Sequence, residues 1–302
     1  MNEYYEFVSL YHPDRLCDYL ISCLLDYCIK KDKFVEFRLD CTLADNVLNF
    51  IGIIKINCDL TKDELSNLIR KELRNLNLLH KPINLNIEII NKNTKRRNFD
   101  GTGIYYGFAC TYTPFYIPLN YLTSYITHQR LESIYKNDYY KSNFIFQDNK
   151  ILQSITLDSQ IGTVDLYNPL NNCEINYNYK AGSNLMGMSG RKLGIDYYNS
   201  LVPNNGGSPW GKDPYNTDLV LNIYAHKLAV SFIKQNKCFG EIKSKLIYLG
   251  KNQGILEFYS SINNLIGSPK IIDLNSNLVE NLKLNRPIYK KLCKNGLFFS
   301  KI

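Results

Sequence analysis

The segment YHPDR, residues 11–15, places a histidine, a proline and an acid where a helical apolar pattern begins. Pro13 suits the first turn of a helix because its missing N–H has no partner to lose there. Asp14 in that turn would meet the positive end of the helix dipole. His12 and Asp14 could therefore form a ligand site, with backbone donors for a phosphate and a carboxylate for a divalent cation. An ordinary helix start would use the same residues, so both interpretations stay open.

A second cationic segment is GMSGRKLGID, residues 187–196, in which Arg191 stands beside Lys192. Arginine can hold a phosphate at two points, whereas lysine acts as a point charge. The pair is therefore a candidate phosphate-binding group. An exposed basic pair at the start of a strand is the alternative.

A glycine-rich segment, GGSPWGKDPYNTD, follows closely in the sequence. Gly206 and Gly207 would let the backbone approach a ligand. Lys212 could then reach a phosphate, and Asp218 could hold a metal. A flexible surface loop is the alternative interpretation of the same residues.

Composition limits the class of protein. The 302 residues are 45% hydrophobic and 21% charged, which is typical of a globular chain of two or three small domains. The net charge of +8 suits a polyphosphate or nucleic acid, and equally a solvated basic surface. No apolar run approaches the roughly 20 residues that span a bilayer, and the N-terminus lacks a signal-peptide pattern. Nine cysteines without a C-x-x-C pair argue against a zinc site or disulfide framework and favour a reducing cytoplasm.

The elements that would position these residues follow a strand, strand, helix pattern that recurs three times. Helical spacing predicts a helix over about 13–30, and Thr61 with Glu64 predicts a capping box at the start of a second helix. The other predicted elements are strands at 46–57, 83–90, 103–112, 191–198, 243–250 and 254–261, helices at 118–135 and 215–234, and a hairpin over 150–168.

This pattern predicts an α+β fold of three pseudo-symmetric βαβ-type domains, each a sheet with helices on one face. The predicted domains are an N-terminal one over 1–95, a central one over 98–178 and a C-terminal one over 180–302. The basic run at 91–98 is predicted to be an exposed loop between the first two.

In their order and spacing the segments resemble the methionine adenosyltransferases, or S-adenosylmethionine synthetases. The G-H-P-D-K motif of that family reads YHPDR here, and its P-D-A-K reads QDNK. Its G-L-T-G-R-K and G-K-D-P motifs correspond to GMSGRK and GKDP, and its R-P-I-Y-K recurs unchanged near the C-terminus. The resemblance covers essentially the whole chain, which is shorter than a typical member.

The resemblance implies a displacement in which the sulfur of methionine attacks C5′ of ATP. The triphosphate leaves and is cleaved to pyrophosphate and phosphate. Prepositioned cations would stabilise the charge that develops on this leaving group. The implied catalytic residues are His12 at the ribose 5′ oxygen and Lys150, Arg191, Lys192 and Lys212 at the phosphates.

The resemblance also implies ligands for cofactors and ATP. Asp14 and Asp218 would hold two Mg²⁺ ions, and Asp40 would bind K⁺. The implied ATP-binding residues are Arg15, Asp148, Gly206, Gly207 and Tyr177, the last at the position of an adenine-stacking phenylalanine.

The amino-acid half of the family's site is altered in this sequence. The family's acids fall at Gly101, Leu185 and about Ile53, and a family lysine four residues after Lys212 is Asn216. Asp100 and Asn184 adjoin two of the lost acids, so they are the candidate substrate-binding residues.

Three functions remain open from the sequence. The chain could use ATP and methionine, or it could use another acceptor or only cleave a polyphosphate on the same fold. It could also be a non-catalytic or regulatory subunit of a heteromer. The resemblance implies a homodimer or larger assembly with sites at the subunit interface, and no nucleic-acid or membrane partner.

Overall fold

The computed structural model describes residues 2–44, 46–78, 81–136, 138–147, 150–158, 173–180, 186–199, 201–203 and 206–299. The strands in this part are β1 (Glu3–Val8), β2 (Glu36–Ala44), β3 (Val47–Ile56), β4 (Ile83–Asn91), β5 (Gly103–Cys110), β6 (Tyr140–Gln147), β7 (Lys150–Asp158), β8 (Cys173–Lys180), β9 (Gly187–Met188), β10 (Glu241–Gly250), β11 (Gln253–Ser260) and β12 (Lys270–Asp273). The helices are α1 (Pro13–Lys31), α2 (Lys62–Asn75), α3 (Leu119–Ile134), α4 (Leu193–Asp196), α5 (Thr217–Gln235), α6 (Asn277–Asn281) and α7 (Tyr289–Asn295).

The described strands form three four-stranded sheets. Two of them share one pairing pattern: β9-β2-β3-β4 and β1-β6-β7-β8 each have two antiparallel pairs followed by one parallel pair. The third sheet, β5-β10-β11-β12, is antiparallel throughout. The fold is therefore α+β, with three four-stranded sheets, two of which share one topology.

Each sheet contains one strand from a distant part of the chain. β1 pairs with β6, β5 pairs with β10, and β9 pairs with β2. The sheets therefore do not coincide with the contiguous ranges 1–95, 98–178 and 180–302, since each takes an edge strand from another range. Each range contains three strands of one sheet, except for the last two residues of β8, and the fourth strand comes from another range.

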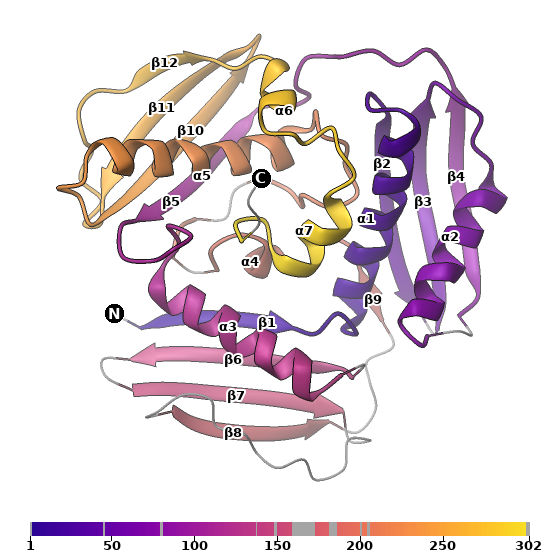
Figure 1. Cartoon of the computed structure of the whole chain (residues 1–302), viewed down its shortest axis with the longest axis horizontal. Helices are drawn as coiled ribbons and strands as arrows, with labels where there is room; N and C mark the ends of the chain where they lie inside the picture. Colours follow the sequence, from indigo (N-terminus) through magenta and orange to yellow (C-terminus); the bar gives the residue numbers. More distant parts are fainter. Residues whose placement is uncertain are drawn as a thin grey trace.

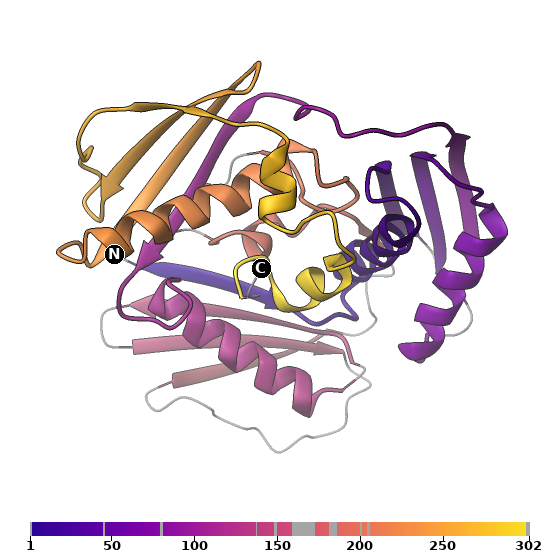
Figure 2. The ribbon, with the colours of Figure 1, turned by 45° about the horizontal axis from the view of Figure 1, so that its top comes forward.

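The helices pack against the sheets and meet in the middle of the molecule. α1 and α2 lie on the first sheet, α3 on the second and α5 on the third (Figure 1). α4 and α7 lie between the three sheets, and the turned view shows the same arrangement (Figure 2). The main core runs through this central region and includes Trp210, Tyr198 and Tyr121, each almost completely buried.

Local capping explains where the principal helices begin. The side chain of His12 accepts a hydrogen bond from the N–H of Asp14 at the start of α1, where Pro13 occupies the first turn. The Thr61–Glu64 capping box predicted from the sequence is present at α2. Asn216 caps α5 by accepting the N–H of Asp218.

One predicted strand is wrong. Residues 191–198 form no strand, because Gly190 turns the chain away from the sheet at a φ of 77° and the short helix α4 follows. The first half of the predicted hairpin over 150–168 forms β7, whose neighbours are β6 and β8. The second half of that hairpin lies outside the described part of the chain.

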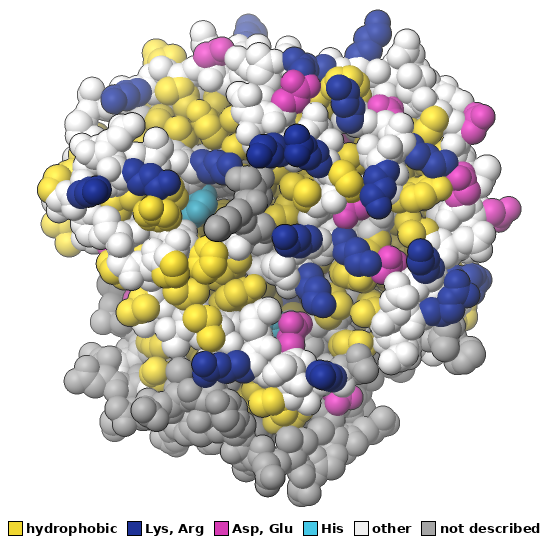
Figure 3. Space-filling view, viewed as in Figure 1, with side chains coloured by type: hydrophobic (Ala, Val, Ile, Leu, Met, Phe, Trp, Pro, Cys, Tyr) yellow, Lys and Arg dark blue, Asp and Glu magenta, His cyan; other side chains and the backbone are white. Residues whose placement is uncertain are grey.

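Among the described residues, no helix combines the length and the apolar content needed to cross a membrane. Lys and Arg side chains are scattered over the face seen in Figure 3 rather than gathered into one patch. On this face, the charge surplus in the sequence is therefore spread over several elements.

Candidate active site

The N-terminus of α1 brings together three of the predicted site residues. The Nζ atom of Lys192 lies 3.5 Å from Oδ2 of Asp14, and the imidazole Nδ1 of His12 lies 3.9 Å from the same oxygen. These side chains are mostly buried, with exposed fractions of 10–14%. A histidine, a carboxylate and a lysine from positions 180 residues apart in the chain therefore share one site.

The protonation of His12 follows from its hydrogen bond. Its Nδ1 accepts the N–H of Asp14 at 3.2 Å, so the neutral ring carries its proton on Nε2. Burial and then the nearby charge of Lys192 lower the pKa of His12 to about 4. At neutral pH the ring is an uncharged donor through Nε2.

The glycine-rich segment forms a second group around Lys212 and Asp218. The Nζ atom of Lys212 lies 2.5 Å from Oδ2 of Asp218, which stands in the first turn of α5. A methyl group at Gly207 would lie 2.8 Å from that Nζ, and one at Gly206 would lie 2.8 Å from Oδ1 of Asp218. Gly206 also has a φ of 87°, a conformation that glycine adopts without strain. The backbone can approach the ion pair only because both residues are glycine.

The segment that contains β9 connects the two groups. The N–H of Met188 donates to Asp14 at 2.9 Å, and the N–H of Gly190 donates to Asp18 at 2.8 Å. On its other side, Gly190 lies against Ser208, where a β-carbon would come within 2.8 Å. The α1 N-terminus and the glycine-rich segment are therefore held against the same short stretch of backbone.

Arg191 and Lys192 leave this stretch in different directions. Lys192 turns toward Asp14 and also lies 3.4 Å from Oε1 of Glu6. Arg191 is exposed, and its side chain forms no hydrogen bond or ion pair with the described residues. The guanidinium of Arg191 therefore remains open to an anionic ligand.

Arg15 lies apart from both groups. Its Nη1 is 2.6 Å from Asp196 and 3.6 Å from Asp18, and all three side chains are buried. Burial and then the charge of Asp196 raise the pKa of Asp18 well above its ordinary value. Arg15 thus partly neutralises two buried carboxylates, one on α1 and one on α4.

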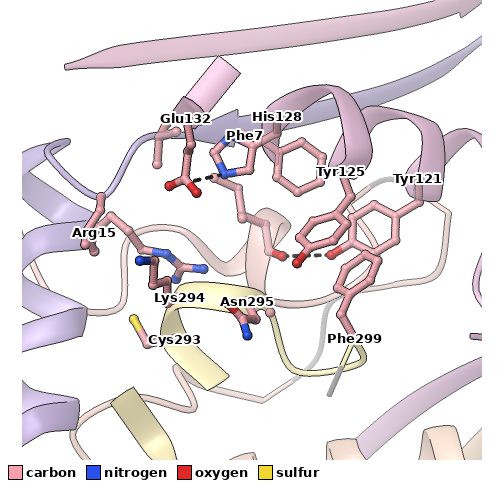
Figure 4. Close-up of a pocket in the computed structure, with 14 residues that line it drawn as sticks. Phe7, Arg15, Tyr121, Tyr125, His128, Glu132, Cys293, Lys294, Asn295 and Phe299 are labelled. Atoms are coloured by element: carbon pink, nitrogen blue, oxygen red, sulfur yellow. Dashed lines mark hydrogen bonds and ion pairs between the residues drawn. The ribbon is translucent and has the colours of Figure 1, made fainter. Parts of the chain in front are cut away.

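The same arginine borders a hollow between α1, α3 and α7, opposite Glu132 and His128 (Figure 4). This hollow has a volume of about 20 Å³, which is room for about one water molecule. It is therefore too small to be the nucleotide site.

Two acids lie on or beside the first sheet: Asp40 on β2, and Asp100 in the segment between β4 and β5. Asp100 forms an ion pair with Arg38 of β2, and Asp40 accepts a hydrogen bond from Ser189 at 3.2 Å. Among the described residues, neither side chain forms a hydrogen bond or ion pair with Lys192 or Lys212.

Several predicted residues are not described with side chains. Asp148 and Asn184 lie outside the described part of the chain. Lys150 is described only as the first residue of β7, opposite Gln147, and Tyr177 only as a residue of β8, opposite Ile155. Their roles stay predictions.

Sequence reasoning missed three residues that complete these groups. Glu6 of β1 is bracketed by Lys192 and by Lys141, whose Nζ lies 2.5 Å from its carboxylate. Tyr197 donates its hydroxyl proton to the carbonyl of Gly207 at 2.8 Å. The alternating segment YYEFV predicts a strand that carries Glu6, but no motif marks Lys141 or Tyr197.

The carboxylates of Asp14 and Asp218 are the predicted donors for metal ions. No group of three or more His, Cys, Asp or Glu side chains able to hold a metal ion is found among the described residues. Asp14 and Asp218 each stand beside a lysine. Mg²⁺ commonly binds through one or two carboxylates plus substrate phosphates, so these donors suit a metal that arrives with a nucleotide.

No family model matches the sequence. Over 97% of the chain, the sequence is 21% identical to the S-adenosylmethionine synthase of Helicobacter hepaticus and 24% identical to that of Zymomonas mobilis subsp. mobilis, covering 91% of each. The fold matches an unusual S-adenosylmethionine synthetase from Campylobacter jejuni with a TM-score of 0.82 at 18% identity, covering all of this chain and 95% of that one.

The chain is similar in sequence and in fold to the S-adenosylmethionine synthases. Every relative named here carries that description, and the matches extend over nearly the full length of both partners. The resemblance inferred from the motifs is therefore confirmed, as is the fold that it implies.

His12 gives a prediction that needs no turnover. Without ligand, its NMR titration should have a midpoint near pH 4. Adding tripolyphosphate without Mg²⁺ should raise this pKa, because a nearby anion favours the imidazolium. Each unit of increase corresponds to tenfold tighter anion binding by the protonated protein, so binding should tighten as the pH falls.

His128 and His226 are internal controls for this titration. Both are buried and hydrogen bonded to tyrosines, and burial lowers the pKa of His128 to about 3 and that of His226 to about 4. Their signals should not respond to tripolyphosphate. If the pKa of His12 does not change when tripolyphosphate is added, the prediction that His12 lies at a phosphate site is wrong.

Proposed function

We propose that the chain is an adenosyltransferase that converts methionine, ATP and water to S-adenosylmethionine, phosphate and diphosphate. The observation that supports this most is the joining of the α1 N-terminus and the glycine-rich segment through the β9 segment. His12, Asp14, Lys192, Lys212 and Asp218 are brought into two neighbouring groups by that contact. Such a set of donors and acids suits a triphosphate with its metal ions.

His12 would act on the leaving group. Its neutral ring carries the proton on Nε2, so it can donate to an oxygen on which negative charge develops. The donor is fixed in orientation because Nδ1 is held by the N–H of Asp14. A preorganised donor of this kind stabilises the transition state without reorganising.

The cations would neutralise the phosphates. Arg191 is exposed and unpaired among the described residues, so its guanidinium group is available for bidentate binding of a phosphate. Lys192 and Lys212 each have a carboxylate partner in the ligand-free protein. In the complex the phosphates would replace these carboxylates, and Lys150 would contribute from the start of β7.

Asp14 and Asp218 would then hold the two Mg²⁺ ions. Bound Mg²⁺ would neutralise charge on the departing triphosphate. Asp40, beside Ser189 on the first sheet, would provide a carboxylate for K⁺. Asp100 and Asn184 would contribute to acceptor binding, with Tyr177 at the adenine, Asp148 near Lys150, and Gly206 and Gly207 against the phosphates.

The decisive test is product analysis by mass spectrometry after the pure protein is incubated with ATP, Mg²⁺, K⁺ and methionine. We expect S-adenosylmethionine, phosphate and diphosphate. Phosphate release without this product, or adenosine joined to another thiol or thioether, would favour a same-fold enzyme with a different acceptor. If calorimetry detects no nucleotide binding at any Mg²⁺ concentration, a non-catalytic subunit becomes the better interpretation.

Replacing His12 by Ala should lower kcat about 10²–10³-fold while changing ATP affinity little. The reason is that His12 would act on charge that appears only in the transition state. The change also removes the cap of α1, which costs about 1 kcal/mol of stability. His12→Ser is the matched control, because serine keeps a capping oxygen but cannot reach as far. Both variants should lose turnover, whereas only the alanine variant should lose stability; an unchanged kcat would reject the role.

We also propose that the chain forms at least a homodimer through the open faces of its sheets. The first sheet exposes Ile51, Ile53 and Met188 on the face opposite its helices, with exposed fractions of 55%, 39% and 39%. Covering such a face is favourable. Light scattering at micromolar concentration should give a mass of at least twice 35.1 kDa. A mass near that of one chain would contradict the dimer, and Ile51→Lys should shift a dimer toward the monomer.

A further inference from the structure

A hollow of about 310 Å³ lies on the open side of the first sheet. This volume is within the range of small-molecule sites. It contains more cations than acids and one apolar side chain. Its lining residues are Glu36, Arg38, Ile53, Lys55, Arg97 and Asp100.

Strand register builds the floor of this hollow. Arg38 of β2 is directly opposite Ile53 of β3, and Glu36 is opposite Lys55. Directly opposed residues lie on the same face of a sheet, so these four side chains share the open face. The segment after β4 adds the remaining two residues of the lining.

The hollow adjoins the glycine-rich segment described above. The backbone of Arg38 is bridged to that of Lys212, and the backbone of Asp100 is bridged to that of Asn216, the cap of α5. Two backbone connections therefore tie the hollow to Lys212 itself and to Asn216, two residues before Asp218. A nucleophile bound here would stand next to the proposed triphosphate site.

The charged side chains of the hollow differ in their ion-pair partners and in their exposure to solvent. Glu36 faces Lys92 at 2.8 Å and Lys55 at 3.2 Å, so an added ammonium would have to displace a lysine. Arg97 is paired with Asp213. Arg38 and Asp100 are paired with each other and are the most exposed charges of the lining, at 62% and 48%.

We propose that Arg38 binds the carboxylate of the acceptor and that Asp100, beside it, takes the acceptor's ammonium. An adjacent arginine and aspartate present opposite charges side by side, which matches the two charges of an α-amino acid. The planar fork of arginine suits a carboxylate, and Ile53 offers an apolar surface to an aliphatic or thioether chain. The inference rests on the proposed function and names the acceptor class: a small carboxylate-bearing nucleophile.

The carboxylate should contribute more than the ammonium. The lining holds three cations and two acids, and one of those acids is covered by lysines. Arg38 is therefore a specificity-determining residue. If the ion pair were only a structural connection between β2 and the segment before β5, its exposure would limit its effect to about 0–1 kcal/mol of stability.

The test compares three ligands by calorimetry, with a non-hydrolysable ATP analogue and Mg²⁺ present. Methionine has both charged groups, methioninol lacks the carboxylate and 4-(methylthio)butyrate lacks the ammonium. We expect the wild type to bind methioninol about tenfold more weakly than methionine, which is the loss of one hydrogen-bonded charge, and 4-(methylthio)butyrate only a few-fold more weakly. The variant Arg38→Gln should bind methionine as weakly as methioninol, with nucleotide affinity unchanged.

Two further variants make the result specific. Arg38→Lys keeps the charge without the fork and should restore part of the discrimination. Arg70→Gln, a matched change at an exposed position of α2, should leave all three affinities unchanged. Equal binding of methionine and methioninol by the wild type, or an unaltered preference in Arg38→Gln, would overturn the inference, as would absence of binding by both carboxylate-bearing ligands.

Failure of this inference can be told apart from failure of the proposed function. If the wild type makes S-adenosylmethionine but uses methioninol equally well, the function stands and the role of Arg38 is wrong. If it makes no adenosyl product yet prefers carboxylate-bearing ligands through Arg38, the proposed reaction fails and the acceptor class stands.

Discussion

Two backbone N–H groups, those of Met188 and Gly190, are accepted by two carboxylates of one helix, Asp14 and Asp18. The geometry of the candidate site depends on this connection. Without it, the segment that carries Arg191 and Lys192 would be fixed to β2 by β9 and Ser189 but no longer to α1 by these hydrogen bonds. A buried carboxylate that loses its partners is costly, so the contact also stabilises the fold. Structure and site are thus determined by the same hydrogen bonds.

The lysines and aspartates of the candidate site form pairs of opposite charge. Lys192 stands beside Asp14, and Lys212 stands beside Asp218. Under the proposed function, an anion alone would take a lysine from its carboxylate, and a metal alone would take a carboxylate from its lysine. Only a nucleotide bound together with its metal supplies a new partner to both members of a pair. Binding of the two is therefore expected to be positively coupled, and by linkage the coupling is reciprocal.

The sequence predicted those parts of the fold that are encoded locally. The capping box at Thr61 and the periodicity of α1, α3 and α5 are local signals, and the structure contains all four features. The segment at 191–198 was predicted wrongly as a strand because its conformation is set by distant groups. Gly190 turns there, and Asp196 is held by Arg15 from a helix that begins near the N-terminus.

The candidate site shows the same division. Motifs identified His12, Asp14, Lys192, Lys212 and Asp218, and the structure places these in two neighbouring groups. No motif could show that Arg38 stands beside Asp100, because that pairing depends on the register of β2 against β3 and on the path of the chain after β4. Register is a property of tertiary packing and of turn geometry, not of any single segment.

The exchange of edge strands among the three sheets bears on how the chain can fold. Glu3 is opposite Phe146, Cys110 is opposite Glu241, and Thr42 is opposite Met188. No sheet can close until a strand synthesised more than a hundred residues earlier or later is in place. Pairings of such long range are slow to form, because the entropy of closing the intervening loop must be lost first. A cut between the sheets would therefore leave each sheet without one of its edge strands. During synthesis the open edge of β5 stays unpaired until β10, in the last third of the chain, has emerged.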